Sequence, residues 1–306
     1  MSYSYYPGCS AAGTGRPYEE SLLAVFETLG TGLDALDDWN CCGATAYPST
    51  DLEKGFALSA RNLALAEDAR PGEEAVDLVA PCAGCYRALL KTERMLRDGG
   101  AEAARVGGAL RAIGLDYEGR ARPRHPLDVL VNEVGLDRIE DAVVRPLEGL
   151  RVACYYGCLL VRPYATFDDE RDPTSLERLM QALGAETVDW PHRTRCCGGS
   201  CYCGGPIVGA LPEATLRKSF ELLADAKARG ANVVVSVCPL CQFNLEAFQG
   251  QISRTFHEPI ELTVAYFTQL VGLALGLPER TLGIQRMLNW RLPALAPARG
   301  AVGARA

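Results

Sequence analysis

Two adjacent cysteines occur twice in this chain, each time inside the same larger frame of cysteines. In both frames a lone cysteine precedes the pair and a Cys-x-x-Cys motif follows it. The ten cysteines involved, of thirteen in the chain, are Cys9, Cys41, Cys42, Cys82 and Cys85 in the first frame and Cys158, Cys196, Cys197, Cys238 and Cys241 in the second. Five thiols per frame exceed the four ligands of a structural zinc ion. The pattern therefore indicates iron–sulfur clusters and redox chemistry, in a fold that gathers each set of five.

The frame repeats because the chain contains two copies of one unit. The matched segments, first copy before second, are 5–9 with 155–158, 39–43 with 194–198, 79–85 with 235–241, and 125–130 with 257–262. The shared order of these matches predicts a gene duplication. We expect a first unit at residues 1–149, a second at 150–290, and a mobile tail rich in Pro, Gly and Ala at 291–306.

The predicted elements come in the same order in both copies. Helical periodicity marks residues 18–29, 51–69, 174–183 and 212–228, and short apolar stretches mark strands at 33–39, 75–80, 186–190 and 233–237. This alternation predicts an α/β fold of two tandem, pseudo-symmetric units, each a small and partly parallel sheet with flanking helices. Ligands of such sheets lie beyond the carboxyl ends of the strands. Because every cysteine element follows a predicted strand, we expect the five thiols of each copy to meet at one sheet edge.

Zinc and disulfides are the simpler interpretations of these cysteines. A four-thiolate zinc site could use Cys82, Cys85, Cys238 and Cys241, but it leaves the lone cysteines and both adjacent pairs unexplained. A disulfide framework is disfavoured by the chain length, the odd number of cysteines and an N-terminus without a secretory signal pattern. The side chains of adjacent cysteines diverge, so they suit two irons of one cluster better than one ion.

Three cysteines lie outside the two frames. Cys158, rather than Cys154, aligns with Cys9, so Cys154 is predicted to be a small buried side chain on the preceding strand. Cys201 and Cys203 lie in a glycine-rich loop, where they either act beside the cluster or are bystanders. Glycines in that loop would let backbone amides approach cluster sulfurs, and such hydrogen bonds raise a cluster's potential.

His192 and three arginines are the other candidates for chemistry. His192 precedes Cys196 by four residues and is either a proton donor to a departing thiolate or an ordinary loop histidine. Arg162, Arg193 and Arg195 flank the second frame, where they either bind an anionic substrate group or offset thiolate charge. Matching positions in the repeat suggest helix capping or packing for the remaining histidines, His125 and His257.

Composition and missing motifs narrow the function further. A net charge of −7 argues against a nucleic-acid partner. The chain has no glycine fingerprint for nicotinamide or flavin, no Walker loop and no ferredoxin-type cysteine run, so electrons must come from or go to another subunit. The longest apolar stretch, 262–277, is interrupted by polar residues and shorter than the ~20 residues of a membrane span. We therefore expect a cytoplasmic protein without a transmembrane segment.

The doubled frame resembles the CCG-domain, or cysteine-rich domain, family. Over residues 2–290 the chain is similar to the B subunits of heterodisulfide reductases, including the late Tyr-Phe-Thr-Gln-Leu stretch at 266–270. The gaps before each Cys-x-x-Cys, of 39 and 40 residues, are slightly longer than the family pattern. The resemblance implies two noncubane 4Fe–4S clusters, each held by the five cysteines of one frame. It also implies that a disulfide substrate lies between the two clusters.

Two functions from different classes follow from this resemblance. The first is the catalytic subunit of a heterodisulfide-reductase-like complex, which breaks or forms a disulfide, or acts on a thiol or carrier-bound sulfur. Its partners would be a ferredoxin-like iron–sulfur C subunit and a flavin-containing A subunit. The second is an electron-relay or membrane-docking subunit of a succinate/fumarate or glycolate/lactate oxidoreductase. The sequence does not choose between the substrates or the directions of reaction.

Overall fold

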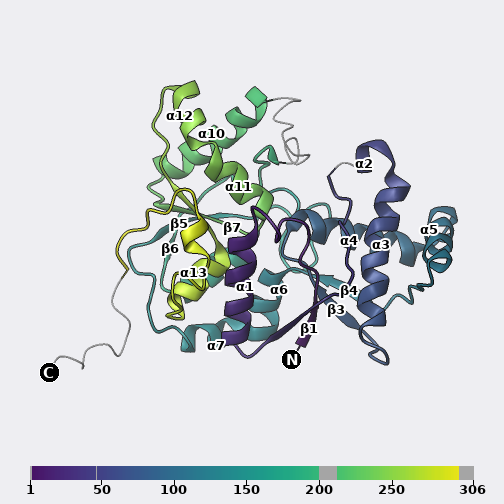
Figure 1. Cartoon of the computed structure of the whole chain (residues 1–306). Coiled ribbons are helices and arrows are strands. Elements are labelled where there is room, and N and C mark those ends of the chain that lie inside the picture. Colours follow the sequence, from purple (N-terminus) through teal and green to yellow (C-terminus); the bar gives the residue numbers. More distant parts are fainter. Residues whose placement is uncertain (1, 46, 200–211, 296–306) are drawn as a thin grey trace.

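The computed structural model of the chain describes residues 2–45, 47–199 and 212–295. It contains two four-stranded sheets in which every pairing is parallel (Figure 1). The first sheet has the order β2-β1-β3-β4 and the second β6-β5-β7-β8. The strands are β1 (Ser2–Tyr5), β2 (Gly32–Ala35), β3 (Val76–Val79), β4 (Ala121–Arg124), β5 (Arg151–Tyr155), β6 (Glu186–Thr187), β7 (Val233–Ser236) and β8 (Thr263–Tyr266). The predicted α/β class with two tandem units is confirmed.

Helices connect the strands and cover the sheets. In the first half they are α1 (Arg16–Thr28), α2 (Tyr47–Thr50), α3 (Leu52–Asp68), α4 (Ala83–Asp98), α5 (Ala101–Ala112), α6 (Pro126–Asp128), the π-helical η1 (Val129–Gly135) and α7 (Leu136–Asp141). In the second half they are α8 (Ser175–Ala182), α10 (Pro212–Ala228), α11 (Pro239–Ala247), α12 (Gln249–Phe256), α13 (Phe267–Ala274) and the 3-10 turn η2 (Ile284–Arg286). The four helices predicted from periodicity correspond to α1, α3, α8 and α10.

The central strands form where the sequence predicts them. All four residues of β7 are buried, as are three of the four residues of β3. Runs of valine suit such strands because a parallel sheet is covered on both faces. The predicted strands at 33–39 and 186–190 correspond to β2 and β6, which are shorter. Each is an edge strand that pairs with one neighbouring strand.

Two strands at the other sheet edges were not predicted, and they correct one of the repeat matches. β4 and β8 occupy equivalent places in their sheets. His125, which follows β4, is therefore equivalent in position to Phe267, which follows β8, and not to His257. His257 lies before β8 and ends α12 in a left-handed conformation, with φ of 54°.

The two halves share one continuous core. Helix α1 of the first half packs against α13 of the second, and the hydroxyl oxygens of Ser21 and Thr268 lie 2.6 Å apart in this buried contact. Tyr18 stacks on Tyr266 with ring centroids 4.6 Å apart. This packing fixes the carboxyl edges of the two sheets relative to each other (Figure 1).

Only the first residues of the predicted tail lie within the described part of the chain. The backbone N–H of Arg291 donates to Thr263 Oγ1 at 2.8 Å. Leu292 and Leu295 pack against the core. The segment before residue 296 is thus attached to the second sheet, and the remainder of the predicted tail lies outside the described residues.

Candidate iron–sulfur site

The cysteine elements all follow strand ends, as the sequence predicts. In the first half, Cys9 follows β1, the Cys41–Cys42 pair follows β2, and Cys82 is the N-cap of α4 after β3. The second half repeats this arrangement after β5, β6 and β7, with Cys238 as the N-cap of α11. From the central pair of each sheet, β1 and β3 or β5 and β7, the chain proceeds to opposite edges of the sheet. In open α/β sheets, ligands bind beyond the carboxyl ends of the strands at this point, where the strand order reverses.

The five thiols of the first frame form one continuous group. Cys9 contacts Cys41, which contacts Cys42. The Cys42 and Cys85 sulfurs lie 3.2 Å apart, and Cys85 also contacts Cys82. We call these five residues the first thiol group.

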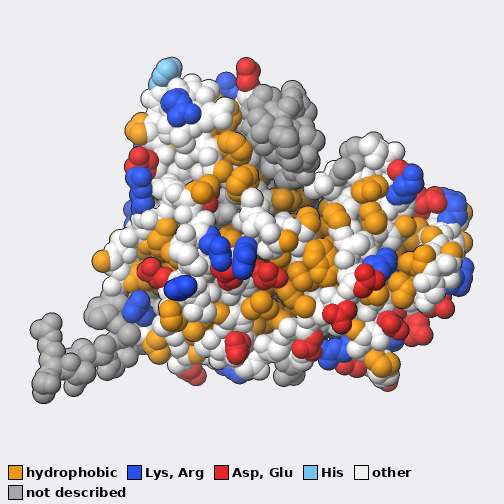
Figure 2. Space-filling model, viewed as in Figure 1, with side chains coloured by type: hydrophobic (Ala, Val, Ile, Leu, Met, Phe, Trp, Pro, Cys, Tyr) orange, Lys and Arg blue, Asp and Glu red, His pale blue; other side chains and the backbone are white. Residues whose placement is uncertain are grey.

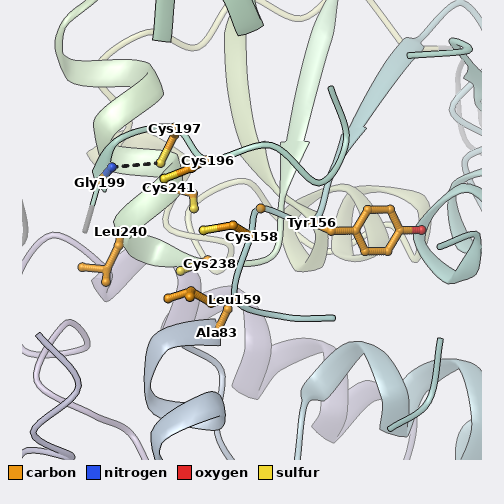
Figure 3. A pocket seen from close by; sticks show the side chains of 11 residues that line it. Ala83, Tyr156, Cys158, Leu159, Cys196, Cys197, Gly199, Cys238, Leu240 and Cys241 are labelled. Carbon is orange, nitrogen blue, oxygen red and sulfur yellow. Dashed lines mark hydrogen bonds between the residues drawn. The ribbon is translucent and has the colours of Figure 1, made fainter. Parts of the chain in front are cut away.

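The five thiols of the second frame line a single cavity, and we call them the second thiol group (Figure 3). Cys158 contacts Cys196, and Cys241 contacts both Cys197 and Cys238. Leu159, Leu240 and Ala83 complete the wall, so the first half contributes to this cavity as well. The Tyr156 side chain points away from the cysteines (Figure 3).

The two thiol groups meet at the junction of the halves. Cys82 and Cys238 are hydrogen-bonded to each other through their sulfurs. Both are buried, whereas Cys9 and Cys41 are exposed at the outer side of the first group. The arrangement is therefore open to solvent at the first group and closed where the two groups touch.

Backbone amides donate to the adjacent cysteine pairs. The N–H groups of Gly198 and Gly199 donate to the sulfurs of Cys196 and Cys197, both at 3.3 Å (Figure 3 shows the second bond). In the first half the amides of Gly43 and Ala44 act in the same way on Cys41 and Cys42. Such bonds favour the thiolate form of a sulfur ligand. The shared backbone turn explains why a glycine follows each pair.

That glycine is required by conformation and by space. Gly43 and Gly198 have φ of +74° and +86°, in the left-handed region. A Cβ atom on Gly198 would lie 2.7 Å from Thr215 Cγ2, and one on Gly43 would lie 3.3 Å from the Cα of Gly55. A larger residue at position 198 would clash with α10, and one at position 43 would lie tightly against α3, while the positive φ disfavours a side chain at both.

The electrostatics of the groups call for a cation. Hydrogen bonds from Cys42 and Cys9 lower the pKa of Cys41 to about 2, while the hydrogen bond with Cys41, together with burial, raises the pKa of Cys42 to about 11. Hydrogen bonds from Cys241 and Cys82 lower the pKa of Cys238, and contact with the neighbouring sulfurs raises that of Cys241. Without added positive charge, neighbouring sulfurs cannot ionise together. Bound iron would remove this conflict, because metal ligation deprotonates a thiol outright.

The donor set fits a multi-iron cluster better than a single ion. Within the described residues, no three His, Cys, Asp or Glu side chains surround one point as a single metal ion requires. This finding does not exclude zinc, because Cys82, Cys85, Cys238 and Cys241 are joined by contacts, but a zinc site would leave the lone cysteines and both adjacent pairs unused. The ligands of a cluster bind different iron atoms, so they need not converge on one point.

A buried histidine links the two Cys-x-x-Cys turns. His125 Nε2 lies 3.2 Å from the carbonyl oxygens of both Pro81 and Val237, the residues immediately before Cys82 and Cys238. His125 Nδ1 accepts the N–H of Leu127 at 3.2 Å, which leaves the proton of the neutral ring on Nε2. The predicted capping role is confirmed. The bridge itself was missed, because it joins segments far apart in the sequence.

The predicted catalytic residues lie beside the second thiol group rather than between the groups. His192 and Arg195 line a cavity of about 160 Å³ whose lining includes one cysteine, Cys196. Burial lowers the pKa of His192, whose Nε2 lies 3.7 Å from Asp225. Arg162 donates to the Thr194 carbonyl and so ties the loop after Cys158 to the loop before Cys196.

The remaining candidates are Arg193 and three cysteines, and the structure describes two of these four residues. Arg193 is bound by the Asp172 carboxylate at 3.0 Å, the Asp189 carboxylate at 3.1 Å and the Trp190 carbonyl at 3.1 Å, so it is occupied by contacts within the protein. Cys154 is buried on β5, where burial raises the pKa of its thiol. Cys201 and Cys203 lie outside the described residues.

Comparisons with known proteins match this chain to a cysteine-rich domain family and to subunits of two kinds of reductase. A family model described as a cysteine-rich domain, CCG, matches residues 3–90 and 152–246. The 8-methylmenaquinol:fumarate reductase membrane anchor subunit of Wolinella succinogenes is 29% identical over 92% of this chain and 95% of its own length. A protein of Archaeoglobus profundus that is described as like the B subunit of heterodisulfide reductase is 29% identical over 93% of this chain and 94% of its own. The B subunit of a ferredoxin/F420H2-dependent CoB-CoM heterodisulfide reductase of Methanosarcina acetivorans is 28% identical over 92% of each.

Among solved structures, a hypothetical protein from Helicobacter pylori shares the fold. Its crystal structure matches with a TM-score of 0.73 and 14% sequence identity, over 95% of this chain and 52% of that one. Across the described residues, we find no helix with both the length and the apolar character needed to cross a bilayer.

Proposed function

Because the chain belongs to the CCG cysteine-rich domain family, we propose that it is the catalytic subunit of a heterodisulfide-reductase-like complex. The two thiol groups would each hold one noncubane 4Fe–4S cluster, with the ligand sets predicted from the sequence. The observation that carries this proposal is the contact between Cys82 and Cys238, which brings the two groups together at one junction. Two adjacent centres suit a reaction in which two sulfur atoms change together.

The reaction would be the two-electron interconversion of a disulfide and two thiols. Reduction of R–S–S–R′ consumes two electrons and two protons and releases RSH and R′SH, and oxidation runs the same balance backwards. When bound, the clusters would supply one-electron chemistry and iron sites for sulfur. A thiol or a carrier-bound sulfur is an alternative substrate. Electrons would pass to or from a ferredoxin-like C subunit and a flavin-containing A subunit.

The residues of this chain would position the sulfurs and handle protons. Amides of the glycine turns hold the adjacent cysteines, and His125 holds the two Cys-x-x-Cys turns. His192 would donate a proton to a departing thiolate during reduction and take one from a substrate thiol during oxidation, and the burial that lowers its pKa favours the second of these steps. Arg195 is exposed beside it and would attract an anionic group, and Arg162 would keep the two loops together.

Metal analysis under anaerobic conditions tests the proposal. Two 4Fe–4S clusters predict about eight iron atoms per chain. Fewer than about four, or stoichiometric zinc instead of iron, would overturn it. Substitution of Cys9 or Cys158 by serine should lower the iron content, whereas substitution of Cys154 should leave it unchanged.

A second function is favoured by the similarity to the Wolinella succinogenes membrane anchor subunit. In that case the clusters would pass electrons within a quinol-linked complex without binding a disulfide. Electron paramagnetic resonance (EPR) of the chain with and without disulfides separates the two functions. A cluster spectrum that no disulfide or thiol perturbs would favour the relay. Cytoplasmic location stays a prediction under either function.

A further inference from the structure

Helices α3 and α4 enclose a second cavity beside the first thiol group, on its side away from the second half. Its volume is about 80 Å³, and its lining includes Cys42, Phe56, Arg87 and Lys91. The described residues that line it all belong to the first half. The cavity is therefore distinct from the one that the second thiol group lines at the junction.

The polar wall of this cavity is cationic and lacks a counter-charge. Arg87 and Lys91 lie one turn apart on α4, and among the described residues no carboxylate lines the cavity. Arg87 Nε is shielded from solvent and has no hydrogen-bond partner within the described part of the chain. A shielded donor without a partner is unfavourable, and more so in a charged group, so an acceptor at this nitrogen would stabilise the site.

Nearby carboxylates on the same helices are already occupied. The ion pairs that occupy them are Lys54 with Asp51 at 3.1 Å, Arg105 with Glu53 at 2.7 Å and Arg97 with Glu93 at 2.7 Å. Lys91 Nζ instead lies over the Phe56 ring, 4.9 Å from its centroid. Within residues 2–45, 47–199 and 212–295, Arg87 and Lys91 thus form a pair of like charges with no acidic neighbour bound to either.

The internal repeat does not share these two cations. Arg87 and Lys91 stand two and six residues after Cys85, and the same positions after Cys241 are Phe243 and Ala247. The second thiol group has other cations near it, since Arg195 and Lys218 line the separate cavity beside Cys196. Within the described residues, the cavity between α3 and α4 is therefore a feature of the first half that the repeat does not reproduce.

Apart from the hydroxyl groups of Ser59 and Thr92, the side chains of the other walls are apolar. Phe56 is buried at the back, while Leu52 is 39% exposed at the N-terminus of α3. Tyr47, on α2, is also 39% exposed, and apolar side chains gather at this α2–α3 end of the molecule (Figure 2). A ligand with an acidic head and an apolar body would match this arrangement, in which the cations lie inside the cavity and apolar side chains lie toward the surface.

We propose that the cavity between α3 and α4 binds an oxyanion, a carboxylate, phosphate or sulfonate group, between Arg87 and Lys91 next to Cys42. Guanidinium and ammonium groups are the residues that proteins use for such anions. Naming the oxyanion as the acidic group of the sulfur substrate rests on the proposed function; the site itself does not.

Binding can be measured on the anaerobically purified chain without any turnover. Inorganic phosphate is titrated by calorimetry at constant ionic strength, with chloride as the reference salt. Wild type should bind phosphate saturably, and the double variant Arg87→Gln/Lys91→Met should bind at least tenfold more weakly. The matched control, Arg111→Gln/Arg280→Gln, removes two exposed positive charges that form no ion pair within the described residues, and it should bind as wild type does.

A pair of disulfides identifies the source of the anion. Dithiodiglycolate carries two carboxylates and bis(2-hydroxyethyl) disulfide is neutral. Competition of dithiodiglycolate alone with phosphate assigns the site to an acidic substrate, and phosphate binding without competition assigns it to a free anion. Both results support the oxyanion site. Absence of saturable phosphate binding, or equal affinity in the Arg87→Gln/Lys91→Met variant, overturns it. The proposed function is judged separately. If phosphate does not bind but the iron content is normal and the neutral disulfide perturbs the EPR spectrum of the clusters, the oxyanion site is wrong and the proposed function still holds.

Discussion

Replacing His125 should loosen the junction between the two thiol groups. Its Nε2–H serves the carbonyls of Pro81 and Val237, and its Nδ1 caps α6. Val237 keeps a hydrogen bond from the Tyr18 hydroxyl at 3.3 Å, so the Pro81 carbonyl is the group that loses its donor. An unsatisfied buried carbonyl costs about 1–3 kcal/mol. Loss of a helix cap adds about 1 kcal/mol. His125→Phe should therefore lower the free energy of unfolding by about 2–4 kcal/mol.

Two variants separate the bridge from the cap. His125→Asn places an oxygen near the position of Nδ1, so it keeps the cap and loses the bridge. His125→Gln places an amide nitrogen near the position of Nε2, so it keeps the bridge and loses the cap. Anaerobic urea denaturation of the iron-loaded chain gives the unfolding free energies, and EPR reports on magnetic interaction between the two centres. We expect His125→Asn to weaken that interaction and His125→Gln to retain it. Equal spectra for all variants would refute the bridge.

The pH dependence provides an independent check on the same ring. Burial lowers the pKa of His125 to about 4, from an ordinary value near 6.5. The unfolded chain therefore binds a proton in this window that the folded chain does not. Stability is present above pH 6.5 and is lost as pH falls from 6.5 toward 4, by about 3 kcal/mol in total. His125→Phe should lose this part of the pH dependence, and an unchanged slope would contradict the assignment.

Other substitutions test the rest of the site. Gly198→Ala should destabilise the chain and lower its iron content, because the added Cβ would meet Thr215. The control Gly72→Ala, at a φ of +84° with no atom within 4 Å of the added Cβ, should lower stability only. Equal iron content in the two variants would count against the role of the glycine turn. Cys158→Ser should lower iron content and Cys154→Ala should not, as measured by metal analysis; the reverse result would exchange their roles. His192→Gln should slow disulfide chemistry in steady-state assays without changing iron content, and an unaltered rate would remove His192 from the mechanism.

Local sequence signals predicted the elements that carry the cysteines. Periodicity placed α3 and α10 within a residue of their observed ends, and valine-rich stretches placed β3 and β7. β4 escaped detection because arginines alternate through it and before it, and its start is held by Glu67, which accepts the N–H groups of Arg120 at 2.5 Å and Ala121 at 2.8 Å. β8 lies inside one long apolar stretch that also contains α13, so the sequence showed no boundary between them.

Features that join the two halves were beyond local signals. The frame predicted two sets of five thiols, but not that Cys82 and Cys238 touch. That contact depends on the packing of α1 against α13, in which Ser21 and Thr268 meet from opposite ends of the chain. Arginines near the cysteines were natural candidates for substrate binding, yet Arg193 is occupied by carboxylates. Arg87, in contrast, is surrounded by uncharged residues apart from Lys91 in its cavity.

Duplication explains the symmetry of the site, and the departures from symmetry indicate how the halves divide the work. Both halves keep the glycine turn and the N-capping cysteine, which are the parts that hold sulfur. One histidine serves both Cys-x-x-Cys turns, because the equivalent position in the second half is Phe267, which cannot donate a hydrogen bond. Within the described residues, only the first half has the Arg87–Lys91 cavity and the exposed Cys9 and Cys41. The two halves therefore offer an anion different surroundings, with Arg87 and Lys91 in a cavity between helices beside the first thiol group and the exposed Arg195 beside the second.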